Sequence, residues 1–223
     1  GGLAGDALTD ADYNVALGAS ALSTDTLGSR STALGYFALK TQNFTSATDS
    51  YNTAVGFAAG QLVTTGTENT LIGGLAGDAL TDADLNVAVG SQALSSDTKG
   101  SANTAIGRAA LFSQNFTSAT SSYNTGVGYG AGSTITTGIR NTLVGGLAGD
   151  ALTDADFNLA LGYEALSADT LGSRSTALGY QSLATQNFTS ATDSYNTAMG
   201  YHAGAAVTTG VRNTLMGGLT GDA

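Results

Sequence analysis

The chain of 223 residues contains no cysteine, no proline and no tryptophan, and these absences narrow its fold and chemistry. Without cysteine it has no disulfide bridges and no thiolate metal sites. Without proline every residue keeps the backbone N–H that a strand needs for its ladder, which favours a chain rich in strands. No apolar run approaches the roughly 20 residues of a membrane-spanning helix.

Basic residues and histidine are also scarce. Seven Lys and Arg stand against 17 Asp and Glu, for a net charge of −10. This balance argues against nucleic-acid binding, which depends on basic patches, and indicates a well-hydrated surface. The single histidine, His202, has Ala58 and Gly130 at the equivalent positions of the other repeats, so we expect a lone, solvent-exposed side chain. With no nucleophile elbow, phosphate-binding loop or pair of catalytic carboxylates, we expect no enzyme and assign no catalytic, cofactor-binding or metal-binding residues.

The sequence repeats itself at one fixed interval. The string GGLAGDALTDAD begins at Gly1, Gly73 and Gly145, and GGLTGDA begins at Gly217. We predict one continuous array over 1–223, made of super-repeats 1–72, 73–144 and 145–216 and the start of a fourth at 217–223. A fixed period of this kind indicates a solenoid, in which each unit packs on its neighbours.

Each super-repeat contains four shorter units that end in glycine. In the first they read NVALG, STALG, NTAVG and NTLIG and close at Gly18, Gly35, Gly56 and Gly73. The third unit, which closes at Gly56, is longer than the others, and the same order of short and long units holds in all three super-repeats. The Thr, Val and Ile content favours strands. We therefore predict an all-β fold, a parallel β-roll or β-solenoid of about twelve turns.

The residue before each closing glycine is always aliphatic, and we predict that this column is the buried core. The residue before that is Ala, Gly or Leu and should face the opposite side of the strand, where a small side chain would allow close approach of another chain. The aliphatic column comprises Leu17, Leu34, Val55, Ile72, Val89, Ile106, Val127, Val144, Leu161, Leu178, Met199 and Met216.

The units NTAVGFAAG, NTAIGRAAL, NLALGYEAL, STALGYQSL and NTAMGYHAG resemble two groups of repeats. One is the YadA-like head of trimeric autotransporter adhesins, and the other is the NTAVGYxAL repeat of phage tail-fibre proteins. The resemblance covers essentially the whole chain. It implies a left-handed roll, a homotrimer around one axis, an extracellular place on a virion or cell surface, and a role in attachment to a receptor or glycan.

Asparagine forms the most frequent polar column. Stacked Asn side chains can bond to one another along a ladder, so we expect a structural role, with Ser31 and Ser175 as smaller replacements. The column comprises Asn14, Asn52, Asn69, Asn86, Asn103, Asn124, Asn141, Asn158, Asn196 and Asn213.

The acidic turn GDALTDAD brings together Asp6, Asp10 and Asp12 and recurs twice. Aspartates in turns often bond to nearby backbone, which is one interpretation. The other is a weak Ca²⁺ site, because calcium prefers carboxylate and carbonyl oxygens. The recurring sets are Asp78, Asp82 and Asp84, and Asp150, Asp154 and Asp156.

The longer units contain an extended turn with a phenylalanine: Phe44, Phe116 or Phe188. Either the ring covers the end of the coil core or the turn is a protruding contact surface. On the second interpretation, lateral receptor binding would use 42–48 and its equivalents. Asn43, Asn115 and Asn187 also form N-x-T sequons, which matter only in a secretory-pathway host. The arginines before the strands, Arg30, Arg140, Arg174 and Arg212, are expected to be solvated.

These patterns favour a structural and adhesive fibre segment, with a phage tail fibre or a bacterial surface adhesin as the main interpretation. A self-assembling extracellular filament is an alternative. An ice-binding solenoid is a weaker one, because the TTG pairs Thr64-Thr65, Thr136-Thr137 and Thr208-Thr209 occur on one turn in four. A polysaccharide-cleaving β-helix would need a carboxylate cluster that the repeats do not supply.

Overall fold

The structure is a computed structural model that describes residues 1–222. Within this range the chain is all-β and forms a parallel β-solenoid of about twelve turns, as the sequence predicts. Equivalent positions on successive turns are 17 residues apart, or 21 where a turn is long. The described residues include no helix long and apolar enough to cross a membrane.

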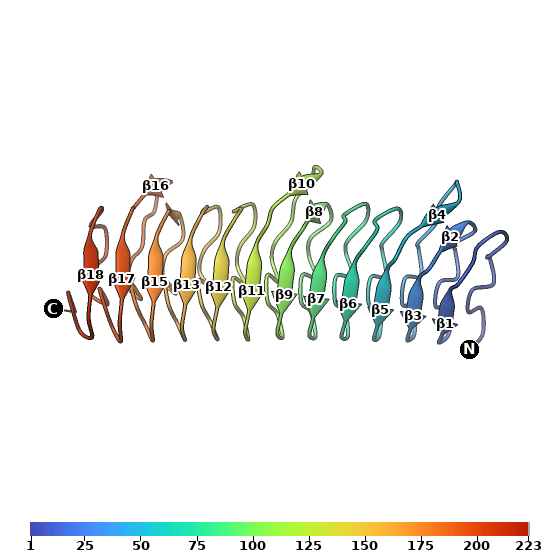
Figure 1. Cartoon of the computed structure of the whole chain (residues 1–223), viewed down its shortest axis with the longest axis horizontal. Helices are drawn as coiled ribbons and strands as arrows, with labels where there is room; N and C mark the ends of the chain where they lie inside the picture. Colours follow the sequence, from blue (N-terminus) through green and yellow to red (C-terminus); the bar gives the residue numbers. More distant parts are fainter. Residues whose placement is uncertain (223) are drawn as a thin grey trace. The chain divides into compact units, whose positions relative to one another are not determined.

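The first compact unit comprises Gly1–Arg108 and Asn115–Ser121. Six three-residue strands pair in parallel in the order β1, β3, β5, β6, β7, β9 (Figure 1). Two pairs of shorter strands, β2 with β4 and β8 with β10, form at a corner where the chain makes its long turns. The strands are β1 Val15–Leu17, β2 Gly28–Ser29, β3 Thr32–Leu34, β4 Thr48–Asp49, β5 Thr53–Val55, β6 Thr70–Ile72, β7 Val87–Val89, β8 Gly100–Ser101, β9 Thr104–Ile106 and β10 Thr120–Ser121.

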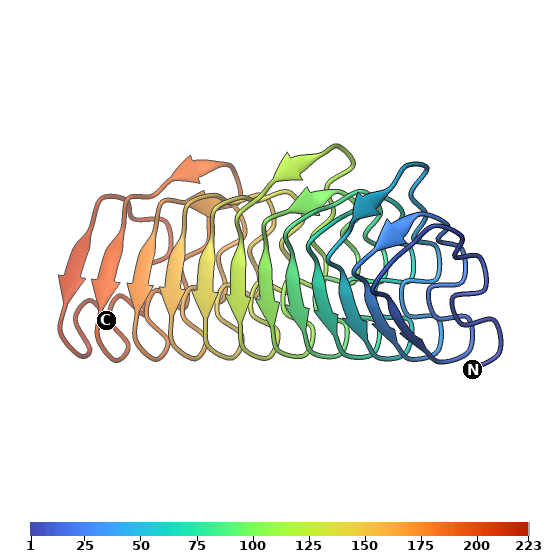
Figure 2. The same cartoon turned by 45° about the vertical axis from the view of Figure 1, so that its right-hand side comes forward.

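The second unit comprises Ala109–Gln114 and Ser122–Ala223. Its three-residue strands pair in parallel in the order β11, β12, β13, β15, β17, β18. The short strands β14 and β16 form one further pair, drawn in orange above the row of longer strands in Figure 2. The strands are β11 Thr125–Val127, β12 Thr142–Val144, β13 Leu159–Leu161, β14 Gly172–Ser173, β15 Thr176–Leu178, β16 Thr192–Asp193, β17 Thr197–Met199 and β18 Thr214–Met216.

Within each unit the closing glycine of a turn stacks on the closing glycine of the next. At Gly56 the backbone has φ of 143°, and an added Cβ would lie 2.4 Å from the carbonyl oxygen of Gly73. A side chain at this position would therefore meet both strain and backbone. This contact explains why the glycine occurs without exception at the end of each strand.

The core lies on the opposite face of the strands from the one that the sequence predicts. Ala54 and Leu71 are fully buried, whereas Ile72 is 38% exposed and Leu17 is 58% exposed. The middle residue of each strand points into the coil, and the aliphatic column points outward. The prediction of a buried aliphatic column was therefore wrong. Because the coil is narrow, its interior has room for mostly small side chains from the three-residue strands.

Large and small residues compensate one another inside the coil. Where the inward strand residue is small, a neighbouring corner of the coil can carry a leucine: a Cβ at Gly126 would lie 3.0 Å from the Leu111 side chain. Where the inward strand residue is the larger Leu71, the two neighbouring corners carry glycine, at Gly60 and Gly77. A Cβ at either glycine would lie 2.7 Å from a Leu71 methyl group. This alternation keeps the interior close-packed.

Candidate interaction surfaces

The asparagine column is a buried ladder, which confirms its predicted structural role. In the first unit Asn69 donates from its backbone N–H to the Asn52 Oδ1 at 2.9 Å, and its Nδ2 donates to the Ala83 carbonyl at 2.8 Å. Asn86 repeats both types of contact one turn later, with the Asn69 Oδ1 and the Gly100 carbonyl. Because each side chain bonds to its own turn and to the next, the ladder holds the coil in register.

The long turns contain a second buried polar network. The Asp25 carboxylate accepts hydrogen bonds from the backbone N–H groups of Gly28 and Phe44 and, at 2.6 Å, from the Gln42 Nε2. The Gln42 amide also donates to the Ser31 Oγ and accepts from the Asn52 Nδ2. Serine can replace asparagine at position 31 because this glutamine fills the remaining space and supplies the missing partner.

This network changes the interpretation of 42–48 as a receptor-binding segment. Gln42 is fully buried and Phe44 is 5% exposed, so the phenylalanine covers the core, as the structural interpretation holds. Only Thr45, Ser46 and Ala47 are exposed at the tip of this turn. Phe116 and Phe188 are likewise buried, so none of the three rings is available as a lateral contact.

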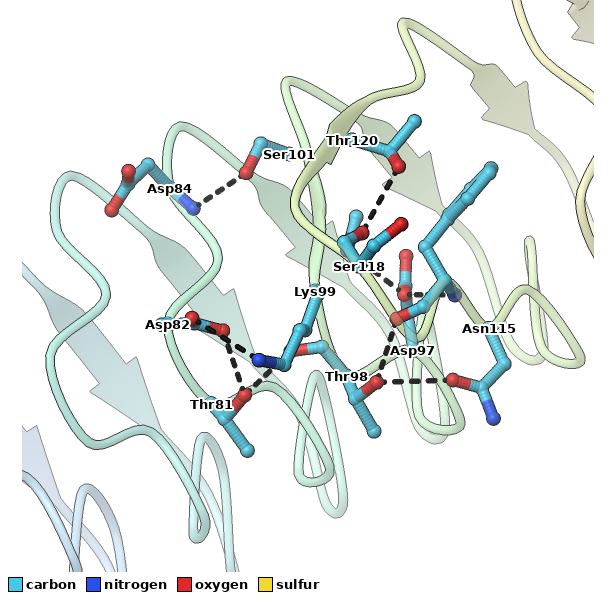
Figure 3. Close-up of polar contacts among 12 residues, drawn as sticks. Thr81, Asp82, Asp84, Asp97, Thr98, Lys99, Ser101, Asn115, Ser118 and Thr120 are labelled. Carbon is cyan, nitrogen blue, oxygen red and sulfur yellow. Dashed lines mark hydrogen bonds and ion pairs between the residues drawn. The ribbon is translucent and has the colours of Figure 1, made fainter.

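The acidic turns connect neighbouring turns of the coil (Figure 3). Asp82 accepts a hydrogen bond from Thr81 and forms an ion pair with Lys99 at 3.4 Å. The Asp84 carboxylate accepts from the Thr67 backbone N–H at 2.7 Å. Within residues 1–222 no three His, Cys, Asp or Glu residues are arranged to hold a metal ion. The contacts of Asp82 and Asp84 therefore fit the interpretation of turn residues bonded within the protein.

Asp78 and its equivalent Asp150 differ from these aspartates. The Oδ1 atom of each is buried and finds no hydrogen-bond partner among the described residues. Burial raises the pKa of both carboxyl groups above the ordinary value of 3.8. Loss of hydration disfavours the charged form, and no neighbouring cation in the described part of the chain offsets it.

Three of the arginines before the strands have specific partners rather than water alone; one is Arg140, whose guanidinium lies 5.3 Å from the Phe157 ring centroid. The Arg30 Nε lies 3.0 Å from the Asp49 Oδ2, and its guanidinium lies 4.9 Å from the Tyr13 ring centroid. In the second unit Arg174 pairs with Asp193 at 2.9 Å and lies 4.8 Å from the Phe157 ring centroid. These side chains remain partly exposed, so each pair adds only modestly to stability.

Each unit exposes one face of its strands, on which a column of aliphatic side chains runs beside a column made mostly of threonine. We call it the outer strand face: it consists of the first and third side chains of every three-residue strand, such as Thr70 and Ile72 of β6. The register places Ile72 beside Val55 on one neighbouring turn and beside Val89 on the other. Exposed aromatics flank these strands in sequence. All large hydrophobic side chains exposed in residues 1–222 belong to this face or its flanks, except Leu3, Leu62, Val211 and Leu219.

His202 lies beside Tyr180 and Tyr201, with its ring centroid 5.4 and 4.3 Å from theirs. It is only partly exposed, so the expectation of a simply solvent-exposed side chain was incomplete. Sequence reasoning did not identify this aromatic group. The signal was present in the tyrosines that follow three successive closing glycines.

No protein-family model matches the chain, and comparisons with curated proteins and with solved structures also give no match. The resemblance to adhesin-head and tail-fibre repeats therefore rests on the sequence motifs. The β-solenoid itself is compatible with a structural fibre or an adhesive role.

Proposed function

We propose that this protein is a structural and adhesive fibre segment on the surface of a virion or a bacterial cell. Its chains associate with one another through the outer strand face, as a homotrimer. The role is mechanical rather than catalytic: the assembled solenoid is a stiff element that carries or presents contacts to a host surface. The exposed apolar face, repeated turn after turn, is the observation that carries this proposal.

A regular apolar surface of this kind favours burial against another protein. Contiguous exposed apolar patches beyond a few hundred Å² are rare on soluble monomers. Each buried Å² of apolar surface contributes roughly 25 cal/mol, so even partial coverage of many turns adds up to a large stabilisation. Leu161 and Met199 are 44% and 42% exposed, although a paired strand lies on each side of both.

A second copy of the chain is the partner that fits this face best. It has the same spacing between turns, so a parallel copy in register would meet every Ile72-like side chain with an equivalent one. Closed point-group symmetry is the usual outcome for such self-complementary chains. The motifs that resemble trimeric adhesin heads support three copies around one axis.

Light scattering on the purified chain tests the proposal. We expect a mass of three times the 22.0 kDa of one chain. Replacing Ile72 and Ile106 with aspartate should yield folded single chains, because both residues lie on the outer face. Thr45→Asp combined with Thr117→Asp is the matched control, since it adds the same two charges at the exposed tips of two long turns. A wild-type chain that stays monomeric at high concentration would refute self-association, and masses growing without limit would indicate a filament.

Attachment is tested separately, by binding of the assembled protein to candidate host cells. The adhesive proposal predicts saturable binding that the monomeric Ile72 and Ile106 variants lose or weaken, because many weak contacts add through multivalency. An assembled protein that binds none of the cell types would be a passive shaft, and the adhesive part of the proposal would fail while the structural part stood.

A further inference from the structure

One surface in this repetitive chain occurs only once. In the third super-repeat the residue after the closing glycine is tyrosine on three successive turns. No other super-repeat has three aromatics in these places. The residues are Ala19, Tyr36 and Phe57 in the first super-repeat, Ser91, Arg108 and Tyr129 in the second, and Tyr163, Tyr180 and Tyr201 in the third.

The three tyrosines form a continuous aromatic row within the second unit. The ring centroids of Tyr163 and Tyr180 are 5.6 Å apart and those of Tyr180 and Tyr201 are 5.4 Å apart, with interplanar angles of 17° and 13°. Each side chain remains between 43% and 57% exposed. The scaffold fixes this spacing, because β13, β15 and β17, which precede the tyrosines, are paired in parallel.

Polar side chains accompany this row, and only the third super-repeat has one at all three positions. Each tyrosine is followed by a hydrogen-bonding residue: Glu164, Gln181 or His202. The Gln181 Nε2 donates to the Glu164 Oε2 at 2.5 Å. Hydrogen bonds from Gln181 and Tyr163 hold the pKa of Glu164 below its usual value, so this carboxylate stays ionised at neutral pH. The equivalent positions hold Ser20, Phe37 and Ala58 in the first super-repeat and Gln92, Ala109 and Gly130 in the second, so each of these has one hydrogen-bonding side chain and not three.

We propose that the patch formed by Tyr163, Tyr180, Tyr201 and their polar neighbours binds a neutral saccharide chain. The inference rests on the proposed adhesive function and assigns it a ligand class and a place. Sugar rings present apolar C–H faces that pack on aromatic side chains and a rim of hydroxyl groups that needs donors and acceptors. The tyrosine row with its amide, carboxylate and imidazole neighbours offers both kinds of contact.

The spacing of the tyrosine rings and the charge of the protein restrict the class of saccharide further. The ring spacing is close to the length that one pyranose unit adds to an extended chain, so successive sugars can meet successive tyrosines. The ionised Glu164 and the net charge of −10 disfavour uronate or sialylated chains. The site is an open row on the surface, so each copy should bind weakly, with a Kd of about 0.1–1 mM, and should gain strength when several copies act together.

The test is a titration of the full chain with three soluble hexasaccharides: one of glucose, one of N-acetylglucosamine and one of galacturonate. We expect one of the two neutral probes to bind and the uronate not to bind. Tyr180→Ala should weaken binding about tenfold, because it removes the central ring and interrupts the row of three aromatic contacts. Tyr36→Ala is the matched control: Tyr36 stacks on Phe57 at 5.7 Å but lacks the polar neighbours, and its loss should leave affinity unchanged.

Three results would overturn the inference: no binding of either neutral probe, stronger binding of the uronate, or equal loss in the Tyr180 and Tyr36 variants. Light scattering on the same variants separates this site from self-association. If Tyr180→Ala changed the mass of the assembly without changing saccharide affinity, a second copy of the chain would cover the patch. Conversely, a monomeric wild type that bound the neutral probe through Tyr180 would refute the proposed trimer and support the saccharide site.

Discussion

Leu71 and Ile72, adjacent in β6, point to opposite sides of the coil. Leu71 is fully buried beneath Gly60 and Gly77, while Ile72 is 38% exposed in line with Val55 and Val89. One short strand therefore serves two purposes, and the two can be separated by mutation. The inward residue supports folding, and the outward residue is available for association.

Aspartate substitutions at these neighbours should have different effects. Leu71→Asp places an unpaired charge in the coil interior, at a cost of several kcal/mol, and should lower the thermal midpoint sharply. Ile72→Asp should leave the strand content unchanged and reduce only the assembled mass. Circular dichroism with light scattering distinguishes these outcomes. If Ile72→Asp alone unfolded the chain and Leu71→Asp did not, the aliphatic column would be the core after all.

The compensation between Leu71 and Gly77 can be tested with a double-mutant cycle. Leu71→Ala alone leaves a cavity and should cost about 3 kcal/mol. Gly77→Leu alone overpacks the same space. Combined, they place a leucine in the volume that Leu71 vacates, while Leu80, whose Cδ1 would lie 2.8 Å from a Cβ at position 77, stays in place.

We therefore expect the double variant to be more stable than the sum of the single effects by about 1–3 kcal/mol. The backbone already accepts leucine at this corner, since Leu39 occupies the equivalent position with φ of 46°. Additive losses in denaturant unfolding would show that the two positions do not share a space.

The turn period and the strands could be predicted from sequence, but the inward face could not. An unbroken aliphatic column is typical of a core. A coil with turns this short is nevertheless too narrow to hold that column on the inward face of its strands. The decisive signal was the pairing of Leu71, Leu143 and Leu215 with glycines at the next corners. Those glycines replace leucines such as Leu22 and Leu39, and such an exchange indicates a shared interior volume.

The asparagine ladder should not accept serine at an ordinary turn. Asn69→Ala removes the donor to the Ala83 carbonyl and the acceptor for Asn86, and should cost about 1–3 kcal/mol. Asn69→Ser should cost nearly as much. The natural Ser31 depends on Gln42 and Ser50, which bond to its hydroxyl from a long turn.

Thermal unfolding of the two Asn69 variants checks this prediction, with Ser31→Ala as the comparison. A serine that restored most of the stability at position 69 would mean that hydroxyl size alone, and not the glutamine of the long turn, determines where serine is tolerated.

The interaction surfaces were less predictable than the ladder. A turn containing Phe44 between polar residues resembles an exposed loop, and only the buried Asp25 carboxylate shows why the ring folds inward. Shortening the long turns would remove Gln42 and Phe44 from the core. A loss of attachment in such a variant could then result from a loss of folding. The arginine contacts also escaped prediction, because Arg30 and Tyr13 belong to successive turns and meet only when those turns stack.

The aspartates with an unsatisfied oxygen predict a pH-dependent stability. Burial raises the pKa of Asp78 in the folded chain above the 3.8 of an ordinary carboxyl group. At pH 7 the Asp78 carboxyl group is ionised in both the folded and the unfolded chain, and only the folded chain bears the desolvation penalty. As the pH falls through the folded pKa, the folded state takes up its proton first and the penalty disappears.

Asp78→Asn removes this charge, so it should raise the thermal midpoint at pH 7. The gain should shrink as the pH falls through the folded pKa and vanish below about pH 3.8, where the wild-type carboxyl is protonated in both states. The effect should be small, because the Asp78 side chain is only partly buried and solvent screens its charge. Asp10→Asn removes the same charge from an exposed turn position and should show no comparable stabilisation at pH 7. A lower thermal midpoint for Asp78→Asn at pH 7 would mean that the carboxylate has a stabilising partner, such as a bound cation. That result would favour the interpretation of the GDALTDAD turns as weak Ca²⁺ sites.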